Sequence, residues 1–237
     1  MTAKNKRLTA CFLINLLIAA MAQLFATTAP ALAECGDDPA PGVDWNNCSK
    51  ERLILSGIDL TGSNFENAYL SGTTLREAKL AGTNFIGSEL VRSDLSDSDL
   101  TGANLEKALA SRSEFNGATL RSARLVKAEF IRVSFVGADL TDADMTSGDF
   151  YRNDFTGAKL VGAILHDAIM PRTVFTDADM IGVDFTGAFL MRSRFEGVDL
   201  SEVKGLEQSQ VDTFCGDTAT VLPAGLLVPA SWPCPVD

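Results

Sequence analysis

The sequence predicts an all-β fold, a solenoid whose coils have four sides of five residues each. Two periodicities predict it. From Leu60 to Leu200 every fifth position carries an apolar residue, and Ala110 is the only small one among these 29 positions. A second pattern has a period of twenty, and it consists of Arg92, Arg112, Arg132, Arg152, Arg172 and Arg192. Internal repeats of this regularity are the signature of solenoid architectures.

The period of five fits neither an α-helix, with 3.6 residues per turn, nor a strand, with a period of two. Residues two apart in an extended chain point to the same side, so the small residue two positions before each Leu or Phe shares its inward face. Because five is an odd number, a turn must follow each such pair to bring the next one inside. Gly, Asn and Asp, which tolerate tight turns, are frequent at the positions that follow. A short side and a turn, repeated, close a polygon with an apolar interior.

The period of twenty predicts four sides per coil. No pentad between the six arginines carries Arg at the same place. An inward aromatic stack with the same spacing is also expected, formed by Phe115, Phe135, Phe155, Phe175 and Phe195. The 29 pentads divided among four sides predict about seven coils.

Residues 53–205 resemble the pentapeptide-repeat family, whose motif is A(D/N)LXX. The motif occurs at Ala103-Asn104-Leu105 and Ala138-Asp139-Leu140, with a near match at Ala143-Asp144-Met145. The resemblance implies a right-handed quadrilateral β-helix with a filled interior and no cavity for a substrate. Three departures are Ala110, Gly148, which leaves its layer thin, and Asn153, whose inward amide needs a hydrogen-bond partner.

Residues 1–33 are predicted to be a signal peptide. A basic start is followed by an apolar run from Cys11 to Phe25 and by small residues at Ala31 and Ala33. The apolar run is shorter than the roughly 20 residues that a spanning helix needs. Export, cleavage, a bacterial periplasmic or secreted location and no membrane attachment afterwards are therefore expected.

Four cysteines remain after this segment, and four cysteines allow three pairings. Cys35 and Cys48 precede the repeats, while Cys215 and Cys234 follow them. An oxidising compartment favours disulfides between the neighbours in each pair. A zinc site is the alternative, although the spacing is wide and the single histidine lies far away.

The segments around the repeats are predicted to cap the two ends of the solenoid. Residues 34–52 are rich in Pro, Asp and Asn and are expected to form a disulfide-closed N-terminal cap. Residues 206–237 are apolar and loop-like and are expected to form a C-terminal cap or tail. Cys215-Gly216-Asp217 and residues 222–226 resemble a tail found on a subset of exported bacterial members of the family.

The chain is acidic, with a net charge of −11. Removal of the N-terminal segment leaves 17 basic residues against 31 acidic ones, a net charge of −14. A surface this acidic repels nucleic acid and anionic membranes, so neither is expected as a partner.

The arginine column and an outward apolar cluster are the candidate binding features. The arginines are expected either to pair with neighbouring carboxylates in a ladder or to form an anion-binding stripe. The apolar cluster is expected either to form an interface or to lie under the tail after Leu206. The candidate binding residues are Arg132, Arg152, Arg172, Arg192, Tyr151, Ile169, Phe189 and Met191.

Neither a catalytic site, a cofactor nor a metal is expected. His166, the sole histidine, stands at an outward position and lacks a nucleophile pattern around it. We therefore predict a non-enzymatic exported scaffold that binds an unidentified protein or polymer, or a second copy of itself in a homodimer. The family resemblance suggests one alternative, a DNA-mimicking regulator of a topoisomerase such as gyrase, which the signal peptide disfavours.

Overall fold

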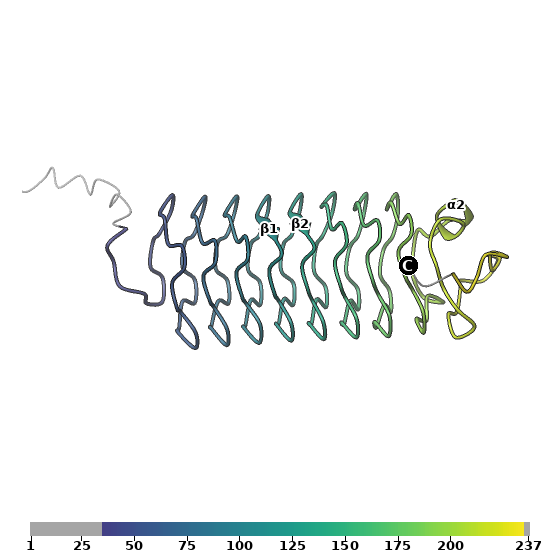
Figure 1. Ribbon diagram of the computed structural model, residues 1–237, viewed down its shortest axis with the longest axis horizontal. Coiled ribbons are helices and arrows are strands. Elements are labelled where there is room, and N and C mark those ends of the chain that lie inside the picture. Colours follow the sequence, from purple (N-terminus) through teal and green to yellow (C-terminus); the bar gives the residue numbers. More distant parts are fainter. Residues whose placement is uncertain (1–34, 235–237) are drawn as a thin grey trace, which may run out of the picture. The chain divides into compact units, whose positions relative to one another are not determined.

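The structure of the protein is a computed structural model that describes residues 35–234, so the predicted signal peptide lies outside the described residues. From residue 41 to residue 204 the chain repeats one five-residue conformation, and its coils follow one another along one axis (Figure 1). The longest extended segments are β1 (Leu109–Ser111) and β2 (Glu129–Ile131), which pair in parallel with Ala110 opposite Phe130. The helix α2 (Gln208–Val211) follows the last coil.

The pairing register confirms the predicted twenty-residue coil. Parallel bridges join residues twenty apart, from Asp44 with Asn64 to Asp184 with Lys204. Each coil has four bridged positions, one per five-residue side. Beyond Lys204 the repeat loosens, because Arg194 pairs with a residue 21 positions later. The protein is therefore an all-β solenoid.

The interior is filled by the residues that the five-residue period placed inside. The predicted phenylalanine stack is present, with ring centroids 4.7 Å apart for Phe135 and Phe155 and 4.8 Å apart for Phe175 and Phe195. Gly148 does not leave its layer thin, which corrects the prediction. A Cβ added there would lie only 2.5 Å from the ring of Phe150, so that ring fills the space.

Polar residues at inward positions mostly bond to the coil before their own. The hydroxyl of Thr73 donates to the carbonyl of Lys50 at 2.6 Å, and the hydroxyl of Ser93 makes the equivalent bond. One of the two polar atoms of the Asn153 amide is hydrogen-bonded: its Oδ1 accepts from the N–H of Val133 at 2.8 Å. Its Nδ2 has no partner within residues 35–234.

The first coil begins before the predicted boundary at residue 53. Val43, Trp45 and Cys48 are buried at inward positions, and Asp44 and Ser49 already form bridges to the next coil. The proposed N-terminal cap is therefore partly a coil in its own right. The prediction missed this because the five-residue apolar spacing is interrupted by a lysine at position 50.

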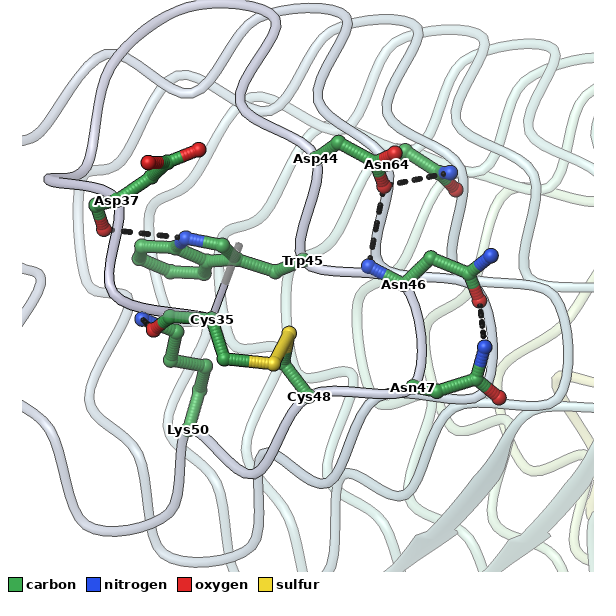
Figure 2. The surroundings of a disulfide bond; sticks show 9 residues. All are labelled: Cys35, Asp37, Asp44, Trp45, Asn46, Asn47, Cys48, Lys50 and Asn64. Atoms are coloured by element: carbon green, nitrogen blue, oxygen red, sulfur yellow. Dashed lines mark hydrogen bonds between the residues drawn. A yellow bond between two sulfur atoms is a disulfide. The ribbon is translucent and has the colours of Figure 1, made fainter. Parts of the chain in front are cut away.

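That lysine closes the N-terminal end of the aromatic interior. Lys50 Nζ lies 3.8 Å from the ring centroid of Trp45 and donates to the carbonyl of Cys35 at 2.6 Å. Figure 2 shows the disulfide between Cys35 and Cys48 beside them, with Cα atoms 5.4 Å apart. The indole N–H of Trp45 donates to the carbonyl of Asp37.

The tail covers the other end of the stack. The ring of Phe214 lies 4.5 Å from that of Phe195, and Trp232 packs on Phe214 in turn. The side-chain amide of Gln210, on α2, donates to the carbonyls of two residues of the preceding coil. A disulfide joins Cys215 to Cys234, with Cα atoms 5.6 Å apart.

Candidate binding face

The arginine column occupies a turn position with left-handed backbone geometry. Its six members from Arg92 to Arg192 have φ between 56° and 59°. Every pentad places one residue in this conformation, and Gly or Asn takes it at many other turns. The left-handed region costs a non-glycine residue about 1–2 kcal/mol. Lys, Asp, Ser and Glu bear the same cost at other turns, so the backbone alone does not explain why arginine recurs at this corner.

The structure extends the column towards the N-terminus. Arg52 has the same geometry, with φ of 56°, and Gly72 is the single interruption between it and Arg92. The sequence prediction does not include Arg52, because Gly72 interrupts the twenty-residue period between Arg52 and Arg92. Its spacing of forty residues from Arg92 was the signal that could have found it.

The predicted ladder of arginines and carboxylates is wrong for the part of the chain that the structure describes. The ion pairs there involve other cations, such as Arg76, Arg121 and Arg124, and no member of the column. The guanidinium of Arg152 lies 5.2 Å from the ring centroid of Tyr151, a weak cation–π contact. The column is thus a positive strip on an acidic protein.

The apolar cluster is exposed beside this strip. Ile169, Phe189 and Met191 are 45%, 48% and 43% exposed, while Tyr151 and Pro171 are half-buried. Ile169 bridges directly to Phe189, so the two side chains are neighbours on adjacent coils. The tail as far as residue 234 leaves them exposed, so of the two alternatives, an interface or a surface under the tail, the second is wrong for the described residues. We refer to Tyr151, Ile169, Pro171, Phe189 and Met191 as the apolar patch.

The regular acidic positions serve the turns. The carboxylate of Asp139 accepts from the backbone N–H of Thr141 at 3.0 Å, and the carboxylate of Asp99 does the same with Thr101. Such bonds between Asp and the residue two positions later stabilise turns. The acidic columns therefore have a structural explanation that needs no resemblance to nucleic acid.

These bonds predict a loss of stability in acid. Hydrogen bonds from the hydroxyl and the backbone of Thr186 lower the pKa of Asp184, and the same groups of Ser201 lower that of Asp199. Because these pKa values are lower in the folded protein, the unfolded chain binds protons at a higher pH than the folded chain does as the pH falls. The stabilisation is therefore complete above the ordinary pKa of 3.8 and is lost as the pH falls below it. We expect the melting temperature, followed by circular dichroism, to stay level down to this pH and then to fall by several degrees. A level profile throughout would contradict the assignment, and Asp199→Asn should flatten the slope.

The described residues offer little for catalysis. His166 is exposed. Between residues 35 and 234, no group of three or more His, Cys, Asp or Glu side chains could hold a metal ion. The helix within this range is too short to cross a membrane.

Comparison with protein families gives one match. A family model described as pentapeptide repeats matches eight copies, in stretches that together run from residue 54 to residue 197. These stretches cover more than half of the chain. No curated protein matches the sequence.

Solved structures with the same architecture are similar at low identity. A trypsin-treated variant of QnrB1, described as a plasmid-mediated fluoroquinolone resistance protein, is 20% identical with a TM-score of 0.69, covering 79% of this chain and 93% of its own. A second such variant is 18% identical with a TM-score of 0.62, covering 76% and 89%. HetL from the cyanobacterium Nostoc, described as involved in heterocyst differentiation regulation, is 22% identical with a TM-score of 0.44, covering 80% and 88%. At these identities the similarities to the two QnrB1 variants show the fold alone.

Proposed function

Because this chain belongs to the pentapeptide-repeat family, we propose that it is a non-enzymatic scaffold that binds a protein or polymer through one face of its solenoid. The observation that carries the proposal is the pairing of two features at one corner. Arginines without ion-pair partners among the described residues stand next to exposed Ile169, Phe189 and Met191. Arginine and large apolar side chains are the groups enriched at protein interfaces.

The proposed molecule is a right-handed β-helix that acts outside the cytoplasm, and the coil before residue 53 raises the expected seven coils to about eight. Its two disulfides are typical of oxidising compartments, which supports export to the periplasm or the medium. The binding face consists of Arg132, Arg152, Arg172 and Arg192 with the apolar patch. A partner that fits it presents acidic groups around an apolar centre.

Self-association is the simplest form of such binding, since the protein itself carries acidic sides. A second copy would bring carboxylates to the positive corner and cover the apolar patch. Nucleic acid and anionic membranes fit the face less well, because the net charge of the chain repels both.

Charge reversal at the corner tests the proposal. We expect Arg152→Glu combined with Arg172→Glu to weaken association about tenfold or more, because it turns attraction for acidic groups into repulsion. The measurements are analytical ultracentrifugation of the chain from residue 34 onward and capture of partners from a periplasmic extract.

The matched control is Lys107→Glu combined with Lys127→Glu. These lysines occupy the same left-handed turn position at another corner, with φ of 56° and 57°. Lys107 also pairs with Glu106 at 3.4 Å, and the loss of such a surface ion pair costs little. The control changes the net charge equally and should leave association unaltered. Equal association of both variants with the wild type would refute the assignment of this face.

A topoisomerase regulator is the second candidate, because the family resemblance suggests it and the acidic charge of the chain favours it. It requires the chain to remain in the cytoplasm. A reporter fused after Glu34 decides this premise: activity of a cytoplasm-dependent reporter supports the regulator, while activity of a periplasm-dependent reporter eliminates it.

A further inference from the structure

A hollow of about 330 Å³ opens at the N-terminal part of the arginine corner. It lies where Gly72 interrupts the column, and it is lined by three arginines on three different coils and by two serines. The lining residues that matter here are Arg52, Arg92, Arg112, Ser71 and Ser111. This place is apart from the apolar patch, which begins at Tyr151.

The missing side chain creates the hollow. Arginines on neighbouring coils follow one another at a rise of roughly 4.8 Å, so the absence of one leaves a gap of about two rises between Arg52 and Arg92. Arg52 leans towards the gap, because its Cγ would lie 3.4 Å from a Cβ built on Gly72. No other atom comes within 4 Å of that Cβ.

Backbone geometry does not demand glycine at this position. Gly72 has φ of 70°, and Arg52 and Arg92 hold nearly the same conformation one coil away on either side. From residue 52 to residue 192, all coils except that of Gly72 carry arginine at this corner. The backbone therefore accepts arginine here, and the effect of glycine at position 72 is the space that it leaves.

The lining groups determine which ligand fits. None of the three arginines makes an ion pair in the described part of the chain. Guanidinium groups bind phosphate through paired N–H donors, and a phosphomonoester carries three acceptor oxygens and close to two negative charges. The hydroxyls of Ser71 and Ser111 add two more donors.

Two negatively charged features limit which class of phosphate-bearing ligand can bind in the hollow. Glu51 also lines the hollow, and its carboxylate can accept hydrogen bonds from hydroxyl groups of a ligand. The net charge of the whole chain repels a long polyanion, whereas a local group of arginines acts on a small ligand within about 8 Å. We propose that this hollow binds a phosphomonoester carried on a small polyhydroxylated body, that is, a sugar phosphate. The site does not depend on the proposed binding face and stands or falls separately from it.

The decisive variant is Gly72→Arg, with glucose 6-phosphate as the probe in isothermal titration calorimetry at low salt. The substitution completes the column and fills the hollow while adding one positive charge. We expect it to weaken binding at least about tenfold, although a purely electrostatic attraction would become stronger. Arg92→Ser should weaken binding by a similar factor, because it removes a lining donor without filling space.

Gly102→Arg is the matched control. Gly102 occupies the left-handed turn position at another corner, with φ of 65° and nothing within 4 Å of an added Cβ. It changes charge and backbone in the same way but leaves the hollow open, so binding should stay within about twofold of the wild type. Thermal melts of each variant establish that it is folded.

The probes separate the chemistry of the ligand. Glucose should not bind, inorganic phosphate should bind more weakly than glucose 6-phosphate, and glucuronate should also bind more weakly because it carries a single charge. Binding to Gly72→Arg that equals or exceeds the wild type would overturn the site. Absence of binding of glucose 6-phosphate to the wild type, or equal affinity for glucuronate, would overturn the phosphomonoester assignment.

Discussion

We expect replacement of Phe155 by alanine to lower the free energy of unfolding by about 3–5 kcal/mol. The ring is fully buried, and its centroid lies 4.7 Å from that of Phe135 and 5.3 Å from that of Phe175. Its removal leaves a void in the middle of the stack. The coils on either side cannot close it, because backbone bridges hold them at a set spacing. Denaturation by guanidinium chloride, followed by circular dichroism, measures the loss.

Two further variants show whether the void is responsible. Phe155→Leu should cost about 1–2 kcal/mol, since leucine occupies the same side of the coil at Leu75 and Leu95 and fills part of the space. Phe189→Ala should cost less than about 1 kcal/mol, because Phe189 is exposed. A loss below about 1 kcal/mol for Phe155→Ala would show that the interior relaxes around the gap.

The second large effect is expected at the C-terminal end. Replacing Cys215 and Cys234 by serine should lower the free energy of unfolding by about 3 kcal/mol, because the unfolded chain is no longer closed into a loop. The bridge also holds the tail that places Trp232 over Phe214. Once the tail is released, the last coil exposes unpaired strand edges and an aromatic ring, so we expect the variant to self-associate.

The N-terminal bridge supplies a matched comparison. Replacing Cys35 and Cys48 by serine opens a loop with a sequence separation of 13, against 19 for the C-terminal bridge. The loop-closure entropy is nearly equal for these two lengths, so we expect nearly the same loss in the free energy of unfolding. It leaves Phe214 covered, so this variant should not associate through the C-terminal end. Chemical denaturation measures stability, and size-exclusion chromatography measures association. Unchanged stability in the C-terminal variant, or equal association of both, would contradict the role given to the tail.

The acid dependence of the turns and the expected loss at Phe155 rest on features that the repeat itself encodes. Asp139 and Thr141 form their turn through contacts within one pentad, and the inward place of Phe155 follows from an odd period in an extended chain. Such local choices are repeated many times with the same outcome, so a single sequence is enough to reveal them.

The two ends of the solenoid and the hollow at the arginine corner could not be predicted from the repeat. The lysine at position 50 interrupts the apolar period, so the first coil was not predicted. Phe214 extends the aromatic stack although it lies beyond the end of the five-residue period. The segment around Lys50 and the tail are not repeated in the chain, so no periodicity predicts where they pack. Likewise, nothing in the spacing of Arg52 and Gly72 showed that they share a hollow with Arg92, because that depends on how neighbouring coils stack.

The sequence by itself determined the coil length, the residues of the interior and the family of this protein, since these follow from spacing along the chain. Only the tertiary structure decided that the column arginines lack ion pairs within residues 35–234 and that the apolar patch stays uncovered there. The physical reason is that most ion pairs of the described residues join neighbouring coils, so they depend on how the coils stack and not on spacing along one coil. The tail packs on the end of the last coil, through Phe214 on Phe195, and leaves the side of the coils exposed.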